Sequence, residues 1–193
     1  MKLYLIIGPM FAGKTSFIIE KFNPENSLAI KPIIDNRYKT KEIVSHNNLK
    51  IPCINIAYLT DLINKINFSE FENILIDEGQ FFEDINKFIN LMEDYQINIF
   101  VAALNGDFKR KPFKVISDLY SRADEIIFKQ GNCKFCDNKS SFSWKFEKDE
   151  NFLSSQIDVG GSEKYQPVCG NCYQDFLEKS SSQKLSENSD LKN

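Results

Sequence analysis

Residues 8–15 read GPMFAGKT and stand between the apolar run LYLII (3–7) and the segment SFIIEKF (16–22). A strand, a glycine loop and a helix in this order form the context in which the pattern G-x-x-x-x-G-K-[S/T] binds phosphate. Glycines let the backbone approach an anion, and the N–H groups of the loop and the helix start form a nest for it. We therefore interpret residues 8–15 as a phosphate-binding loop rather than as a plain glycine turn.

The last two residues of this loop have defined tasks in such a pattern. Lys14 reaches the β- and γ-phosphates, and Thr15 helps to hold Mg²⁺. We expect the loop to bind a nucleoside triphosphate with Mg²⁺. The loop residues assigned to this binding are Gly8, Pro9, Met10, Phe11, Ala12, Gly13, Lys14 and Thr15.

Apolar strands alternate with helical patterns along the chain as far as about residue 130. The expected strands are 3–7, 28–31, 73–76, 97–103 and 125–128. The expected helices are 16–22, 59–66, 82–95 and 115–123. This alternation predicts the α/β class, with a P-loop parallel sheet flanked by helices, and it places the ends of the strands along one ligand-binding edge.

The strand expected at 73–76 ends directly before two acidic residues. Asp77 stands where a P-loop protein places the carboxylate that organises Mg²⁺, although an aspartate there can also simply cap the following segment. Glu78 is its neighbour, and phosphoryl transfer to an alcohol needs a group that accepts the hydroxyl proton. Adjacent acids also occur here in ATPases that activate water, so the pair does not choose between a kinase and an ATPase.

The overall composition disfavours two classes of partner. The 193 residues are 42% hydrophobic and 26% charged, with a net charge of −3, whereas proteins that bind nucleic-acid backbones are usually basic. The acidic balance therefore predicts no nucleic-acid partner. We find no apolar run long enough for a transmembrane helix and no signal peptide, so we also expect no membrane partner and a cytoplasmic location.

Four cysteines form two matched pairs, Cys133-x-x-Cys136 and Cys169-x-x-Cys172. Two residues between cysteines let both thiolates face one tetrahedral ion, so the pairs predict a structural Zn²⁺ site. Redox-active or merely buried cysteines are the alternative, and two matched pairs argue against it. Cys53 stands alone, and we interpret it as a core or exposed thiol without function.

We expect three parts: 1–130 as the P-loop α/β domain that binds ATP, 131–177 as a zinc-binding lasso domain, and 178–193 as a disordered polar tail. Aromatic and glycine residues within SSFSWKF (140–146) and DVGGSEKYQP (158–167) lie between the cysteine pairs. A loop tied at both ends suits a lid over a small ligand. A zinc ribbon that binds nucleic acid or a protein is the alternative.

The chain carries a series of motifs in order, from residue 3 to about residue 173: GPMFAGKT, DNRY, SH, IDEGQFF, VAALNGDFKRKPF, and GGSEKY between the cysteine pairs. This series resembles the type II thymidine kinases, the zinc-containing, cytosolic group. IDEGQFF and DFKRKPF are far more specific than the phosphate loop. The resemblance implies that ATP and thymidine, and also deoxyuridine as acceptor, react with Mg²⁺ to give the nucleoside 5′-phosphate, a salvage step for DNA synthesis.

The resemblance also assigns residues. Glu78 is then the general base on the 5′-hydroxyl. The ATP and Mg²⁺ site extends from the loop to Asp35, Asn36, Arg37, Asp77, Gly79 and Gln80. The thymine pocket and the lasso-like loop that closes over the nucleoside comprise Met10, Phe81, Leu104, Phe108, Phe113, Ser143, Gln156, Ile157, Asp158, Val159, Gly160 and Tyr165.

The resemblance further implies a homotetramer, with a dimer as the alternative, and feedback inhibition by dTTP bound in the active site. The family commonly has Thr where Ser143 stands, and the lost methyl group is expected to retune the choice between thymine and uracil rather than abolish it. The segment between Lys14 and Asp35 is several residues shorter than is usual in the family, which predicts a truncated first helix.

Two other classes share parts of this pattern. An adenylate-kinase-like enzyme with a zinc-bound lid needs several arginines to clamp the phosphates of two nucleotides, and this chain has few, among them Arg37, Arg110 and Arg122. A P-loop ATPase with a zinc ribbon for nucleic acid predicts a basic face and a larger core.

His46, the one histidine, is expected to be a solvated loop residue, and Arg37 is either a phosphate ligand or a solvated arginine.

Overall fold

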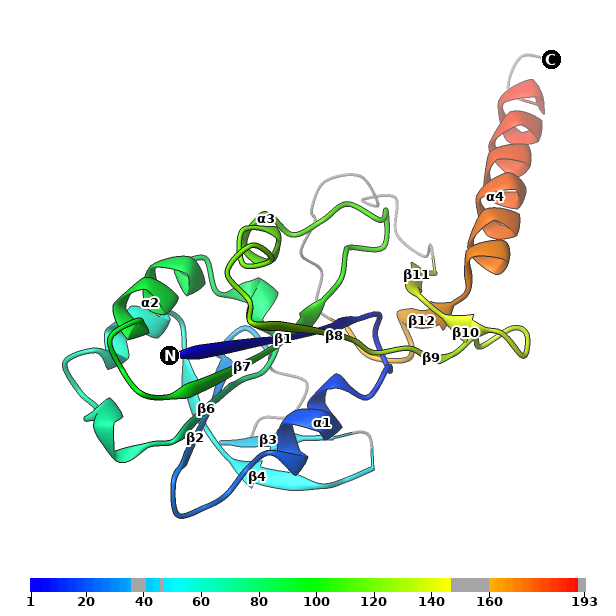
Figure 1. The fold of residues 1–193 in the computed structure, drawn as a ribbon. Coiled ribbons are helices and arrows are strands. Elements are labelled where there is room, and N and C mark those ends of the chain that lie inside the picture. Colours follow the sequence, from blue (N-terminus) through cyan, green and yellow to red (C-terminus); the bar gives the residue numbers. More distant parts are fainter. Residues whose placement is uncertain (36–40, 46, 147–159, 191–193) are drawn as a thin grey trace.

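The computed structural model describes residues 1–35, 41–45, 47–146 and 160–190. A six-stranded sheet lies at its centre, with the order β5-β2-β6-β7-β1-β8 (Figure 1). The strands are β1 (Lys2–Gly8), β2 (Ser27–Pro32), β5 (Ile54–Ile56), β6 (Asn73–Ile76), β7 (Asn98–Leu104) and β8 (Glu125–Phe128). Every neighbouring pair is parallel, which confirms the expected P-loop α/β class.

One face of the sheet is covered by α1 (Lys14–Glu20) and by the antiparallel hairpin of β3 (Glu42–Val44) and β4 (Lys50–Pro52). Ile18 of α1 and Ile43 of β3 are buried against the strands. The hairpin was not expected from the sequence. Its two strands are only three residues long, and they become a recognisable element only by packing on the sheet.

The opposite face carries the larger apolar core. It is covered by η1 (Leu59–Leu62), η2 (Phe68–Glu70), α2 (Ile85–Met92) and α3 (Lys114–Ser117). Alternate side chains of each strand point to opposite faces, so one strand supplies both cores. The strands therefore read as nearly continuous apolar runs, as a sheet covered on both faces requires.

Three of the expected helices are shorter than predicted. Residues 59–66 form only the 3₁₀ helix η1, residues 115–123 are helical only in α3, and the helix expected at 82–95 spans Ile85–Met92. The start of η1 agrees with the expected one, and tertiary hydrogen bonds hold it. The Asp84 carboxylate accepts N–H groups of η1, including that of Thr60 at 2.8 Å, and so ties η1 to the start of α2.

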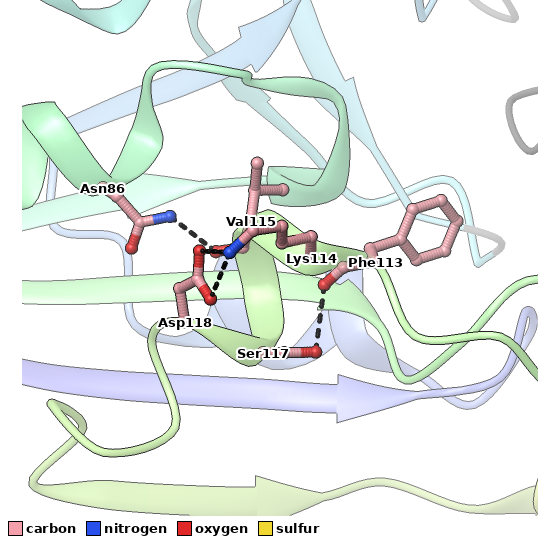
Figure 2. Close-up of polar contacts among 6 residues, drawn as sticks. All are labelled: Asn86, Phe113, Lys114, Val115, Ser117 and Asp118. Atoms are coloured by element: carbon pink, nitrogen blue, oxygen red, sulfur yellow. Dashed lines mark hydrogen bonds and ion pairs between the residues drawn. The ribbon is translucent and has the colours of Figure 1, made fainter.

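The single turn of α3 is held by side chains, as Figure 2 shows. The amide Nδ2 of Asn86 in α2 donates to the carbonyl of Val115 at 2.9 Å. The hydroxyl of Ser117 donates to the carbonyl of Phe113 at 3.2 Å. A helix this short has too few internal hydrogen bonds to be stable alone, so these side-chain contacts help to stabilise it.

Residues after 130 form two small antiparallel sheets followed by a helix, here called the C-terminal module. Its elements are β9 (Gly131–Asn132), β10 (Lys139–Ser140), β11 (Phe142–Lys145), β12 (Tyr165–Val168) and α4 (Gly170–Asp190). In Figure 1, α4 projects away from the central sheet. Residues 178–190, which belong to the segment expected to be a disordered tail, continue α4 in the structure.

In the described part of the chain, none of the helices combines the length and the apolar character that crossing a bilayer requires.

Candidate active site

The phosphate loop connects β1 to α1, as its motif predicts. Gly13 caps α1 with φ of 80°, in the left-handed region that favours glycine. A Cβ on Gly8 would lie 2.2 Å from the carbonyl oxygen of Lys129, so only glycine fits there. Lys14 is buried, and its Nζ donates to the carbonyl of Pro9 at 2.7 Å. The ammonium is therefore folded back onto the loop itself.

Asp77 and Thr15 lie in direct contact, although they are far apart in the chain. The hydroxyl of Thr15 is 3.2 and 3.3 Å from the two carboxylate oxygens of Asp77, which is buried. A hydroxyl beside a carboxylate offers the hard oxygen ligands that Mg²⁺ prefers. The pair expected from the two motifs is thus brought together by the fold.

Glu78 is held in an unusual conformation. Its φ and ψ are 52° and 43°, in the left-handed region, which is uncommon for residues other than glycine and is often found at functional sites. Its Oε2 accepts a hydrogen bond of 2.6 Å from Nε2 of Gln80, and Oε1 of Gln80 accepts the N–H of Leu104 at 3.1 Å. Gln80 is buried and fixes the direction of the Glu78 carboxylate from the end of β7.

Gly79 begins the short helix η3 (Gly79–Phe81) and lies against β7. A Cβ at this position would be 2.6 Å from Cγ1 of Val101, a fully buried side chain. The backbone after Glu78 therefore lies so close to β7 that only glycine fits at position 79.

Replacing Gly79 by alanine is expected to destabilise the fold by about 1–3 kcal/mol, the usual cost of overpacking a core. Chemical denaturation measures the change. Gly170→Ala is the matched control, because a Cβ there would lie 3.7 Å from Phe142, an ordinary contact. Equal stability of the Gly79→Ala variant and the wild type would contradict this account of η3.

A cavity of about 660 Å³ opens over the loop and the two acids. Its lining joins residues of the phosphate loop and first helix turn to residues of the C-terminal module. The lining consists of Met10, Phe11, Ala12, Gly13, Lys14, Thr15, Ser16, Lys31, Asp35, Ile43, Val44, Asn47, Asp77, Glu78, Leu104, Lys134, Ser162, Gln166 and Pro167. Except for Gly8 and Pro9, the loop residues assigned to ATP therefore surround one space, together with Asp35.

Lys31 is a residue of this cavity that the motifs missed. It is 2% exposed, and it is the penultimate residue of β2, just after Ile30, which pairs with Ile76 in the register of β6. Lys31 and Asp77 are the residues directly after this pair, so they lie next to each other at the carboxyl ends of neighbouring strands, on the sheet face covered by α1. A lysine inside the otherwise apolar run LAIKP was the available signal, since buried charges are kept for pairing or function.

The residues assigned to the nucleoside pocket fall into two groups in the structure. Met10 and Leu104 line the cavity. Phe108 and Tyr165 are buried, with ring centroids 6.4 Å apart, and Phe113 is buried in the larger apolar core. These three aromatic residues do not contribute to the cavity lining. Phe81, at the end of η3, and Gly160 are both half-buried.

Ser143 ties the C-terminal module to the phosphate loop. Its hydroxyl accepts the backbone N–H of Met10 at 3.0 Å, and its side chain is 5% exposed. A second contact nearby runs from Nδ2 of Asn105 to the carbonyl of Ser141 at 3.0 Å. The assigned residues Asn36, Arg37, Gln156, Ile157, Asp158 and Val159, and also His46, lie outside the described residues.

The four paired cysteines converge on one point. The Sγ atoms of Cys133, Cys136, Cys169 and Cys172 all lie within 4.8 Å of one another. Cys136 is 3.6 Å from the sulfur of Cys169 and also 3.6 Å from that of Cys172. Four thiols in this arrangement are the donor set of a structural zinc site, so the residues present fit a tetrahedral metal ion such as zinc.

Hydrogen bonds favour the thiolate form of part of this cluster. The N–H of Cys172 donates to Sγ of Cys169 at 3.5 Å, and this bond lowers the pKa of the Cys169 thiol. Burial raises the pKa of the Cys133 thiol, but hydrogen bonds with the backbone of Phe135 and Cys169 outweigh burial. The net effect lowers the pKa to about 7. Thiolates are the form that binds metal ions.

Cys53 has the opposite character. It is half-buried, and burial raises the pKa of its thiol to about 11. Its Sγ donates to Oδ1 of Asn55 at 3.2 Å. A protonated thiol is a poor nucleophile, which agrees with its interpretation as a thiol without a chemical role.

Comparison with known proteins adds independent information. The thymidine kinase family model matches residues 1–173 of the chain. A thymidine kinase of Pseudothermotoga lettingae is 33% identical over 185 residues, which are 92% of this chain and 97% of that protein. A thymidine kinase of Amsacta moorei entomopoxvirus is 37% identical over 185 residues, which are 90% of this chain and 98% of that protein.

Proposed function

The chain belongs to the thymidine kinase family, and from this premise we propose that it transfers the γ-phosphoryl group of ATP to the 5′-hydroxyl of thymidine. Membership makes the protein a kinase, with thymidine and a nucleotide as its substrates. The observation that carries the proposal is the cavity in which the phosphate loop, Asp77 and Glu78 meet. A phosphate site and an acid in one space are what transfer to an alcohol needs.

Binding of the donor falls to the first β–α unit. Backbone N–H groups of the loop would hold the phosphates, and the Lys14 ammonium would move from the carbonyl of Pro9 to a phosphate oxygen. Thr15 and Asp77 would hold Mg²⁺, which neutralises charge on the β- and γ-phosphates when bound. Lys31 adds a further cation to the lining of this cavity.

Glu78 is the proposed general base. Its carboxylate takes the proton of the 5′-hydroxyl as the oxygen forms a bond to the γ-phosphorus, while the bond from that phosphorus to the bridging oxygen breaks and ADP leaves. The hydrogen bond from Gln80 directs this carboxylate. We assign Gln80 to the support of Glu78, because its side-chain amide donates to Glu78 and its side-chain oxygen accepts the N–H of Leu104.

The finer properties follow the resemblance. We propose deoxyuridine as a second acceptor, a role in nucleotide salvage for DNA synthesis in the cytoplasm, a homotetramer and inhibition by dTTP. We assign Zn²⁺ to the four cysteines, since paired C-x-x-C thiols suit this ion. We propose no nucleic-acid partner. The buried Ser143 hydroxyl is held by Met10, so its effect on thymine against uracil is expected to pass through the loop.

Phosphoryl transfer from labelled ATP with Mg²⁺ tests the function, with thymidine, deoxyuridine, deoxycytidine and dTMP offered in parallel. We expect turnover with thymidine and deoxyuridine and none with dTMP, because the cavity is proposed to accept a neutral nucleoside. ATP hydrolysis without transfer to any acceptor would overturn the proposal and favour a P-loop ATPase with a zinc ribbon. Turnover of dTMP in place of thymidine would favour a nucleoside-monophosphate kinase.

A further inference from the structure

A buried hydrogen bond joins the cysteine cluster to the segment 105–113, here called the β7–α3 loop. Tyr173 follows Cys172 in the first turn of α4 and is 3% exposed. Its hydroxyl donates to the carbonyl of Phe108 at 2.8 Å. The N–H of Tyr173 donates to the carbonyl of Cys169 at 3.0 Å, which fixes its backbone to the cluster.

Arg110 of the same loop makes a second contact with the module. Its guanidinium carbon lies 4.5 Å from the ring centroid of Tyr173 and 5.4 Å from that of Phe142 in β11. A planar guanidinium over an aromatic ring is an attractive arrangement that lysine reproduces poorly. Arg110 has φ of 60°, an uncommon backbone conformation for a residue other than glycine.

The β7–α3 loop is internally braced by Asp107. One carboxylate oxygen, Oδ1, accepts the N–H groups of Lys109 and Lys111, both at 2.8 Å. The N–H of Asp107 donates to the carbonyl of Lys111 at 2.9 Å, and the Asp107 side chain is buried. These bonds brace residues 107–111, the part of the loop that contains Phe108 and Arg110.

We propose that Tyr173 and Arg110 form a latch through which the cysteine cluster positions the β7–α3 loop and thereby sets the affinity for the nucleoside. This rests on the proposed function and on the assignment of Leu104 and Phe108 to the nucleoside pocket by the family resemblance. Leu104, directly before the loop, lines the cavity, and Phe108 packs against Tyr165 of the C-terminal module. The ATP side has contacts of its own, from Lys14 to Pro9 and from Thr15 to Asp77, and the hydrogen bond that links it to the module, from Met10 to Ser143, involves neither Tyr173 nor Arg110. Tyr173 and Arg110 are thus positioning residues for the acceptor and not for the donor.

Two variants test the latch with the full chain loaded with zinc. Tyr173→Phe keeps the ring under Arg110 and removes only the hydroxyl, while Arg110→Lys keeps the charge and removes the planar stack. Tyr120→Phe and Arg122→Lys are the matched controls. Tyr120 is 39% exposed, and Arg122 donates to Glu93 and Asn86 on α2 and the turn after it.

Kinetics and hydrogen exchange are the two measurements. We expect each latch variant to raise KM for thymidine roughly threefold to tenfold, the ratio that matches one net hydrogen bond or cation–π contact, with KM for ATP and zinc content unchanged. Amide exchange of residues 105–113 should accelerate in both variants and in neither control. Unchanged exchange, an unchanged KM for thymidine, or an equal rise in both KM values would overturn the latch.

Failure of the proposed function remains distinguishable from failure of the latch. Absence of thymidine phosphorylation by the wild type refutes the function directly. Hydrogen exchange needs no substrate, so it still decides whether Tyr173 and Arg110 hold the loop. If the exchange rates show a latch but thymidine is no substrate, the part of the proposal that concerns nucleoside affinity is overturned.

Discussion

Replacing Glu78 by glutamine is expected to lower kcat by about 10²–10⁴-fold, the usual contribution of a general base. An amide cannot take the proton of the 5′-hydroxyl, but its oxygen can still accept the hydrogen bond that Gln80 donates to Glu78. The variant should therefore fold and bind both substrates nearly as tightly as the wild type. Steady-state kinetics and calorimetric binding of ATP and thymidine separate these two effects.

Glu83→Gln is the matched control, since Glu83 is an exposed glutamate shortly after η3. It is expected to leave kcat and both KM values at their wild-type levels. A Glu78→Gln variant with normal kcat would remove Glu78 from the role of base. A variant whose loss lies entirely in substrate binding would assign Glu78 to ligand binding instead.

Replacing Cys133 by alanine is expected to abolish tight zinc binding and to unfold the C-terminal module before the main sheet. A four-thiolate site is a folding unit with its metal, because zinc binding contributes directly to folding free energy. The core around the cysteines is small, since the buried members of its cluster are Val168, Tyr173 and two of the cysteines themselves. Metal analysis and calorimetric unfolding measure the two effects, and thymidine phosphorylation should be largely lost.

Cys53→Ala serves as the control for this experiment, because Cys53 lies outside the cluster and outside the cavity lining. It should keep the zinc content, the unfolding profile and the activity of the wild type. Wild-type protein purified without any bound zinc, but with full activity and a single unfolding transition, would refute the structural role of the metal.

Much of the fold could be predicted from local patterns. The strands at 73–76 and 125–128 match β6 and β8 at both ends, and the class of the sheet is confirmed. The apolar residues of β6 are buried, as in the interior of a parallel sheet, whereas β8 lies at the edge and leaves Ile126 and Phe128 exposed. The expected helices were wrong in extent, because helices as short as these depend on packing against the rest of the fold.

Local sequence patterns identified the groups whose chemistry depends on neighbours in the chain. The phosphate loop needs glycines and a lysine at fixed spacing, and each cysteine pair needs two intervening residues, so both are readable as motifs. The acids after β6 are readable for the same reason. Each of these features is complete within a few residues, and no distant contact is required to recognise it.

The contacts between residues that are distant in the chain became visible only in the folded structure. The contact of Thr15 with Asp77, the place of Lys31 in the cavity and the hydrogen bond from Tyr173 to Phe108 all join separate segments. Hairpin β3–β4 likewise exists because Ile43 and Ile51 are buried against the sheet. Such contacts depend on strand order, register and close packing, and these are properties of the whole chain that no local spacing encodes.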